Sequence, residues 1–205
     1  MLVTGAAGFA GGHLLERLAG HHELVGWSRS APAPALAGLA TWQHVDLLDR
    51  ERVRALARAL RPSAVYHLAG VTQVSDSFAD TAKPLAGNVL ATHHLFDALR
   101  RAGAPCRILL TSSATVYDSS DLPLTEESRL APASPYGVSK LAQEQLGLRA
   151  IREDGLEVVV ARRKDPWQRP AAWAEEAHVG ARDRRQTAAI GGPGEPGRAD
   201  AVAGA

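Results

Sequence analysis

A glycine-rich segment close to the N-terminus constrains the fold of this chain most strongly. The sequence TGAAGFAG places Gly5, Gly8 and Gly11 three residues apart, between an apolar run at residues 1–4 and a helix-type run at residues 12–19. A strand that turns through glycines into a helix presents backbone N–H groups that can bind the pyrophosphate of a dinucleotide. Gly5 is expected to make the turn, Gly8 to allow close approach, and Gly11 to let the helix pack on the strand. The alternative is an ordinary glycine-rich connection, which the strand before it and the helix after it disfavour.

Strand-type and helix-type segments alternate through the first 161 residues. This alternation is typical of βαβ units, in which helices cover both faces of a parallel sheet. We therefore expect a doubly wound α/β fold of the Rossmann type, an NAD(P)-binding domain, over residues 1–161. Further strands are expected at residues 24–27, 41–45, 64–68, 107–111 and 157–161, and further helices at residues 49–60, 87–102 and 135–153.

The composition changes after residue 161. All 25 leucines lie at or before Leu156, and 28 of the 44 residues from 162 to 205 are Ala, Gly, Arg or Pro. Such a segment cannot supply a buried strand or an apolar helical stripe, so we expect residues 162–205 to form an irregular or disordered tail. Because the codons for those four residue types are GC-rich, the tail has two interpretations: an out-of-frame translation, or a natural disordered segment.

Charge and cysteine content exclude several classes of function. The chain carries 23 Lys and Arg against 22 Asp and Glu, a net charge of +1, which argues against a nucleic-acid partner. Its single cysteine, Cys106, cannot form an internal disulfide, and no His, Cys or carboxylate cluster has the spacing of a metal site. The sequence shows neither a signal peptide nor an apolar run of the roughly 18 residues that a membrane span needs. These features predict a cytoplasmic protein with no membrane partner and no metal.

Two motifs in the second half of the α/β region carry acid–base chemistry. Tyr136 and Lys140 lie four residues apart on an expected helix, so both side chains share one face. The ammonium group would lower the pKa of the phenol toward neutrality, where it can donate or accept a proton. Ser113, at the end of the preceding strand, would hold the substrate oxygen. A surface tyrosine–lysine pair often arises by chance, and it is the combination with the glycine turn that favours the catalytic interpretation.

The end of the second strand indicates which dinucleotide is bound. NAD sites commonly place Asp or Glu there to bind the ribose hydroxyls of adenosine. This chain has Arg29 and no carboxylate in the segment GWSRS, and an arginine can pair with a 2′-phosphate. NADP is therefore favoured over NAD, unless Arg29 is a solvent-exposed residue with no role.

Together these motifs resemble the extended branch of the short-chain dehydrogenase/reductase superfamily, the nucleotide-sugar epimerases, dehydratases and reductases. The resemblance covers residues 1–161 and rests on TGAAGFAG, on Asp46 and Leu47 in HVDLLD, on HLAG at residues 67–70, on Asn88, and on Ser113, Tyr136 and Lys140. It implies that NAD(P) is bound and that Ser113, Tyr136 and Lys140 are catalytic. The residues expected at the cofactor site are Gly5, Gly8, Phe9, Ala10, Gly11, Arg29, Asp46, Leu47, Leu68, Ala69, Gly70, Tyr136 and Lys140.

The resemblance implies hydride transfer at a sugar carbon of a nucleoside-diphosphate hexose. The family's dehydratases carry an acidic pair after the serine, whereas this chain has Ala114 and Thr115, so epimerase or reductase chemistry is favoured. Residues 123–140 also resemble GDP-6-deoxy-4-ketohexose reductases in texture.

Members of this family read the sugar with a C-terminal lobe, and residues 162–205 do not resemble one, so the substrate lobe is expected to be missing and turnover impaired. Two alternatives stay open: a non-catalytic NADP(H)-binding module, and an inactive truncated gene product. The resemblance also allows a homodimer.

Overall fold

A six-stranded parallel sheet forms the centre of the computed structural model, which describes residues 1–120 and 123–162. The strand order is β3-β2-β1-β4-β5-β6, and it reverses between β1 and β4. A reversal of this kind brings the carboxyl ends of two strands beside a crevice in which α/β proteins bind ligands. The doubly wound α/β fold expected from the sequence is confirmed. The strands are β1 (Leu2–Thr4), β2 (Val25–Ser28), β3 (Thr41–His44), β4 (Ala64–His67), β5 (Arg107–Thr111) and β6 (Glu157–Ala161).

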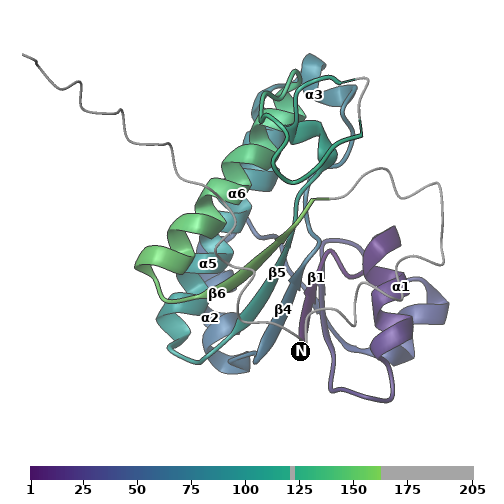
Figure 1. The fold of residues 1–205 in the computed structure, drawn as a ribbon. Coiled ribbons are helices and arrows are strands. Elements are labelled where there is room, and N and C mark those ends of the chain that lie inside the picture. The colour runs from purple at the N-terminus through teal and green to yellow at the C-terminus, as the bar shows by residue number, and fades with distance from the viewer. Residues whose placement is uncertain (121–122, 163–205) are drawn as a thin grey trace, which may run out of the picture. The chain divides into compact units, whose positions relative to one another are not determined.

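Helices cover both faces of the sheet. The helix α1 lies on one side of the strands, and α2, α5 and α6 lie on the other (Figure 1). The long helices of the described residues are α1 (Phe9–Leu18), α2 (Arg50–Leu60), α5 (Ala91–Ala102) and α6 (Pro135–Glu153). The shorter segments are α3 (Asp76–Ala79), α4 (Ala82–Pro84), the 3₁₀ turns η1 (Pro34–Leu39) and η3 (Ala114–Val116), and the π-helical segment η2 (Leu85–Leu90).

The two faces of the sheet build two apolar clusters because neighbouring strand residues point to opposite sides. In β1, Leu2 belongs to the cluster that includes the buried side chains of α2 and α5, whereas Val3 packs with Leu15 of α1. Each of these three side chains is fully buried. Burial of a leucine or valine side chain contributes about 1.5–3 kcal/mol, so these clusters hold the strand ends in place for the site.

The first helix begins earlier than the sequence predicts. We expected it to begin at residue 12, but α1 begins at Phe9, with Gly8 as its N-cap. The reason is that the N–H of Gly12 bonds to the carbonyl of Gly8 at 2.8 Å and closes the first turn. The glycine segment therefore supplies both the turn and the start of the helix.

The helix expected over residues 87–102 begins as a π-helix. The N–H of Ala91 bonds to the carbonyl of Ala86, five residues earlier, and α5 continues from there. The π segment places Asn88 fully buried, with its Oδ1 accepting from Val71 N at 2.8 Å and its Nδ2 donating to Ser139 Oγ at 2.8 Å. Asn88 thus ties the segment after β4 to α6.

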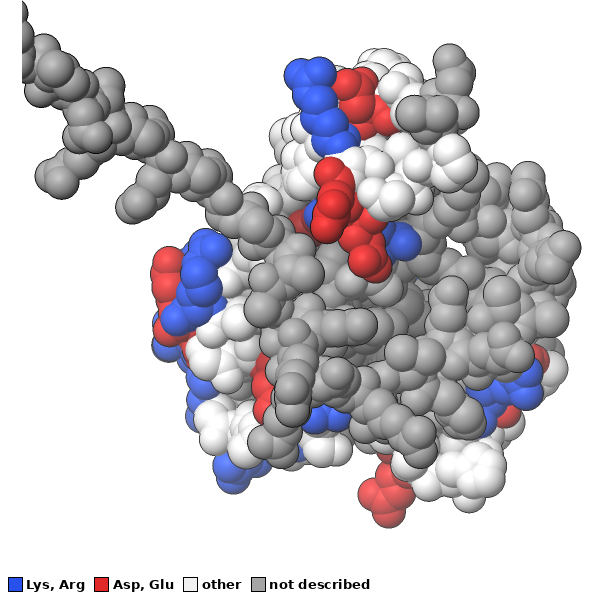
Figure 2. Space-filling view, viewed as in Figure 1, with Lys and Arg blue, Asp and Glu red and all other residues white. Residues whose placement is uncertain are grey.

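Opposite charges pair across the surface of the described residues. Arg54 of α2 donates to Asp97 of α5 at 2.7 Å, and Arg149 of α6 pairs with Glu153 at 3.1 Å. On the face in Figure 2, blue and red side chains lie beside one another at the left edge and at the top. Among the described residues, no helix is both long enough and apolar enough to cross a membrane.

The expected tail is described only at its first residue. Arg162 follows β6 directly, and its side chain contacts α6. The expectations for the rest of residues 162–205, including the out-of-frame interpretation, lie outside the described residues.

Candidate functional site

The turn after β1 forms a narrow backbone cradle. Gly5 has a φ of +69°, a conformation that L side chains rarely adopt. A Cβ at Gly5 would lie 2.7 Å from the backbone nitrogen of Ala69, and a Cβ at Gly11 would overlap the backbone of Gly5 and Ala6. Gly11 therefore lets the helix pack on the turn itself, where the sequence predicted packing on the strand.

The start of α1 faces the space above this turn. A Cβ at Gly8 would meet only the carbonyl of Gly5, at 3.1 Å, so the outer side of Gly8 is open. The first N–H groups of a helix lack intrahelical acceptors, and those of Ala10 and Gly11 belong to this turn. Backbone donors at a helix N-terminus fit an anionic pyrophosphate. Phe9, beside them, exposes 62% of its surface and meets the ring of His13 edge-on at 4.7 Å.

The HLAG segment lies against the glycine turn. The N–H of Leu68 bonds to the carbonyl of Thr4, and the N–H of Ala69 bonds to Thr4 Oγ1, both at 3.3 Å. Gly70 is required there because a Cβ would lie 2.6 Å from Asn88 Oδ1. The structure therefore brings two of the expected cofactor segments together at the carboxyl ends of β1 and β4.

The other expected cofactor residues follow the next two strands. Arg29 is exposed directly after β2. Asp46 follows β3, and its carboxylate accepts the N–H of Leu48 at 2.9 Å. Leu47 is buried, and its carbonyl accepts a hydrogen bond from His94 Nδ1 at 2.9 Å. Carboxyl ends of parallel strands meet at one sheet edge, so Arg29 and Asp46 share the edge of the glycine turn.

Local capping brings Tyr136 to Ser113. Ser134 caps α6 by accepting the N–H of Gly137 at 3.0 Å, and Pro135 occupies the first turn. A Cβ at Gly137 would lie 2.5 Å from the carbonyl of Thr115, so the start of α6 packs tightly on η3. The side chain of Ser113 therefore lies close enough to Tyr136 to affect its pKa.

The electrostatics of this pair differ from the sequence prediction. Burial raises the pKa of Tyr136, and the hydrogen bond with Ser113 acts in the opposite direction. The expected lowering of this pKa by Lys140 was wrong, because the shift is upward and burial is its main cause. Lys140 Nζ donates instead to the carbonyl of Thr111 at 2.7 Å and to Gln143 Oε1 at 2.6 Å. Burial lowers the pKa of Lys140 to about 8, and Glu144 acts in the opposite direction.

A buried chain of hydrogen bonds, which the sequence analysis missed, connects Lys140 with the glycine turn. Its links are Lys140 to Gln143 at 2.6 Å, Gln143 to Thr92 at 2.6 Å, Thr92 to His67 at 2.8 Å, and His67 to Thr4 at 2.7 Å. Burial, and secondarily the charge of Lys140, lowers the pKa of His67 to about 3, so the imidazole is neutral. Helical spacing offered a signal, since Gln143 lies three residues after Lys140 and Thr92 four after Asn88.

A second buried cluster, centred on Glu144, was not predicted from the sequence. This carboxylate, with a side chain 3% exposed, accepts from Arg162 at 2.9 and 2.8 Å and from Ser112 Oγ. Arg162 also donates to the hydroxyl of Tyr117 at 3.0 Å. The cluster joins the ends of β5 and β6 to the middle of α6, one turn after Lys140.

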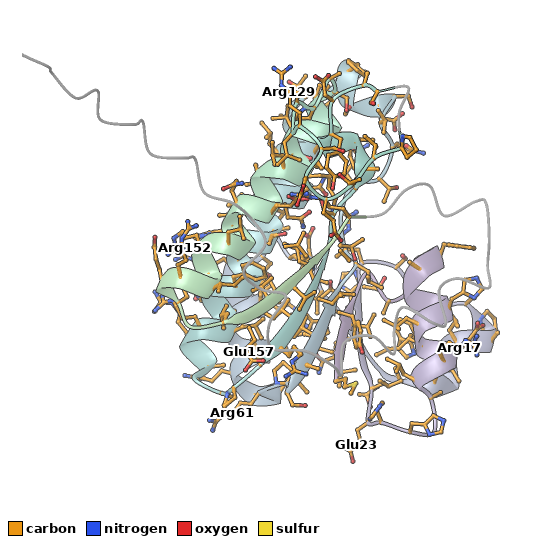
Figure 3. The ribbon with its side chains drawn as sticks, in the orientation of Figure 1. Arg17, Glu23, Arg61, Arg129, Arg152 and Glu157 are labelled. Carbon is orange, nitrogen blue, oxygen red and sulfur yellow. The ribbon has the colours of Figure 1, made fainter. Side chains whose placement is uncertain are left out.

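The remaining candidates lie away from this region. Among residues 1–120 and 123–162, no three His, Cys, Asp or Glu side chains are grouped to hold a metal ion. Cys106 is buried, and burial raises the pKa of its thiol to about 11. The labelled Arg61, Arg129 and Arg152 point outward in Figure 3, whereas other side chains crowd between α6 and the sheet.

Comparisons with known proteins agree with this geometry. Residues 1–165 match the NAD dependent epimerase/dehydratase family. The chain is 39% identical over 165 residues to GDP-6-deoxy-D-mannose reductase of Pseudomonas aeruginosa, covering 79% of this chain and 50% of that protein. It is 35% identical over 157 residues to UDP-glucose 4-epimerase of Bacillus subtilis, covering 71% and 46%.

A solved structure shows the same fold. The UDP-glucose 4-epimerase of Brucella ovis, in complex with NAD, superposes with a TM-score of 0.73 at 32% identity, covering 78% of this chain and 50% of that one. The chain spans about half the length of the curated relatives that it matches.

Proposed function

Because this chain belongs to the NAD-dependent epimerase/dehydratase family, we propose that residues 1–161 bind NAD(P) and hold the acid–base residues of a nucleotide-sugar epimerase or reductase. The observation that carries the proposal is the arrangement of Ser113, Tyr136 and Lys140. Ser113 lies close enough to Tyr136 to affect its pKa, and Lys140 Nζ donates to the carbonyl of Thr111 at the end of β5. In a parallel sheet, this end lies at the same edge as the glycine turn.

The cradle of the glycine turn would hold the cofactor. Gly5 makes the turn against Ala69, the open side of Gly8 would leave room for a pyrophosphate, and the first turn of α1 would offer its N–H groups. Leu68, Ala69 and Gly70 would line the cradle beside Gly5. Asp46 and Leu47 would lie toward the adenosine end. When bound, NAD(P) supplies a hydride acceptor or donor for a sugar carbon.

Three side chains of this chain would handle the hydroxyl proton. Ser113 would accept or donate a hydrogen bond at the substrate oxygen and orient it toward Tyr136. Tyr136 would take up or return the proton of that oxygen. Lys140, buried one turn after Tyr136 on α6, would bind the ribose of the cofactor through its remaining N–H group.

NADP rather than NAD is the proposed cofactor. The support is Arg29, exposed directly after β2, because a guanidinium can pair with a 2′-phosphate. The carboxylate of Asp46, on the neighbouring strand end, already accepts the N–H of Leu48. The relative from Brucella ovis is in complex with NAD, so titration with both dinucleotides distinguishes the two cofactors.

The proposed substrate is a nucleoside-diphosphate hexose, with epimerase or reductase chemistry. The names of the two curated relatives refer to a GDP sugar and a UDP sugar. The residues after Ser113 are Ala114 and Thr115, which cannot act as a carboxylic acid and base for the loss of water. The same proposal includes assembly of the protein as a homodimer and an effect of residues 162–205 on turnover.

Comparison of two tyrosine variants of the full chain tests this proposal. Tyr136→Phe removes one oxygen, and we expect turnover of the accepted nucleotide sugar to fall by roughly 10²–10⁴-fold, the usual contribution of a general acid–base group. Cofactor affinity, measured by titration calorimetry, should change by no more than about threefold, which is less than 1 kcal/mol, because the substitution removes no packing. Tyr66→Phe, on β4, is the matched control and should leave both quantities unchanged.

Two results would contradict the proposed function. Full turnover by Tyr136→Phe would remove the catalytic assignment. Tight NADP(H) binding without turnover of UDP-glucose or of a GDP-4-keto-6-deoxyhexose would favour the non-catalytic NADP(H)-binding module instead.

A further inference from the structure

The ammonium group of Lys140 is held by two acceptors. Its Nζ donates to the carbonyl of Thr111 and to Gln143 Oε1, at 2.7 and 2.6 Å. An ammonium has three N–H groups, so one donor is left for another acceptor. The direction of that third N–H follows from the positions of the first two, and therefore depends on the side chain of Gln143.

The amide of Gln143 has only one favourable orientation. If it were reversed, its NH₂ group would face the ammonium of Lys140 and both groups would be donors. In the observed orientation, its Nε2 donates to Thr92 Oγ1 at 2.6 Å. Gln143 and Thr92 are 1% and 0% exposed, so water does not compete for these bonds.

Thr92 and His67 hold the side-chain amide of Gln143 in this orientation. Thr92 Oγ1 accepts from Gln143, and its other side-chain partner in the described residues is His67 Nε2 at 2.8 Å. Its hydroxyl proton therefore goes to Nε2, which assigns the ring proton of His67 to Nδ1, facing Thr4 Oγ1 at 2.7 Å. Every donor in the chain then points from Lys140 toward the glycine turn.

We propose that Gln143 is a positioning residue for Lys140, with Thr92 and His67 fixing the orientation of its amide. The inference rests on the proposed function, because Lys140 is the group whose third N–H would reach the cofactor ribose. A carbonyl oxygen 2.6 Å from a buried ammonium also stabilises its positive charge.

Other charged and titratable groups surround Lys140 and also influence its pKa. Glu144 favours the charged lysine from the same helix, but its carboxylate is already engaged by Arg162 and Ser112. His67, on β4, is neutral, and Tyr136, one turn earlier on α6, is protonated because burial raises its pKa. Gln143 is therefore an acceptor whose removal leaves these charges unchanged.

Lysine NMR on the full chain tests the proposal without requiring turnover. The sequence contains only three lysines, Lys83, Lys140 and Lys164, so ¹³C-labelled lysine gives three side-chain signals. Lys140→Met identifies the signal of interest, and a pH titration then gives its pKa. We expect a value near 8 in the wild-type protein.

Three variants separate positioning from packing. Gln143→Met keeps the length of the side chain and removes the acceptor, and should lower the pKa of Lys140 by about one unit or more. Gln143→Glu places a carboxyl group there and should raise it. Gln145→Met, an equivalent change on the exposed face of α6, should leave it unchanged.

The outcome is decided by the sign of the shifts. Opposite shifts in Gln143→Met and Gln143→Glu support the proposal, and equal values in all variants overturn it. If Gln143→Met does not fold, Thr92→Val replaces it, since releasing the amide should lower the same pKa by a smaller amount. A failed turnover assay with these shifts present would reject the proposed function and leave the positioning role intact.

Discussion

Removal of Arg162 should destabilise the α/β domain strongly. Its guanidinium makes two hydrogen bonds to Glu144, at 2.9 and 2.8 Å, and the side chains are 16% and 3% exposed. In Arg162→Met, the carboxylate stays buried with the hydroxyl of Ser112 as its remaining hydrogen-bond donor. Loss of one partner of a buried ion pair costs about 3–5 kcal/mol because the other charge is left uncompensated. At about 2–4 °C per kcal/mol for a domain of this size, Tm should fall by roughly 6–20 °C.

Thermal and urea unfolding of the full chain measure this cost. The matched control is Arg107→Met, which removes the pair with Glu157 across β5 and β6. Those side chains are 63% and 68% exposed, and such a pair contributes about 1 kcal/mol or less. The double variant Arg162→Met/Glu144→Met removes both charges and should recover most of the loss, since buried pairs can be replaced by apolar residues at little cost.

The comparison with the control decides the result. If Arg162→Met lowers Tm no more than Arg107→Met does, then Arg162 does not stabilise Glu144 in solution. If the double variant is as unstable as the single one, the loss comes from packing rather than from an unpaired charge.

Three further predictions concern single residues. Arg29→Ala should weaken NADP(H) binding about tenfold, worth ~1.4 kcal/mol, and leave NAD(H) binding unchanged in titration calorimetry; equal losses would refute the role in 2′-phosphate binding. The lowered pKa of His67, about 3 against the usual 6.5, means that the unfolded chain takes up a proton that the folded chain does not. The wild-type protein should therefore lose stability as pH falls from 6.5 toward 3, and urea unfolding should show a smaller loss in His67→Gln. Cys106, whose thiol pKa is raised to about 11, should react slowly with an aromatic disulfide at pH 8 in the native protein and rapidly in denaturant; fast native labelling would contradict its burial.

Elements with strong local signals were predictable from the sequence. The strands β5 and β6 and the helix α6 have the bounds expected from apolar runs and from the Ser134–Pro135 cap. The glycine turn was predictable because its spacing reflects a backbone requirement that is now visible at Gly5 and Gly11. These features depend on residues close together in the chain.

The partners of Lys140 were not predicted, because they depend on segments that are distant in the sequence. The position of Tyr136 four residues before Lys140 suggested a direct electrostatic effect, yet the ammonium is directed to Thr111 and Gln143. Thr92 reaches Gln143 only because α5 and α6 pack on the same face of the sheet. The buried pair of Glu144 and Arg162 likewise joins residues 18 positions apart.

The π-helical segment η2 makes the length of this region critical. A π turn holds one more residue than an α turn, so it shifts the helical phase of everything that follows by about 100°. Before the shift, Asn88 faces Val71 and Ser139; after it, Thr92 and Leu95 of α5 face the interior. Deletion of Ala86 would convert the segment to an ordinary α-helix. Either Asn88 or the pair Thr92 and Leu95 would then keep its buried position, but not both. The number of residues between β4 and α5 is therefore as specific a property of this protein as the identity of any side chain there.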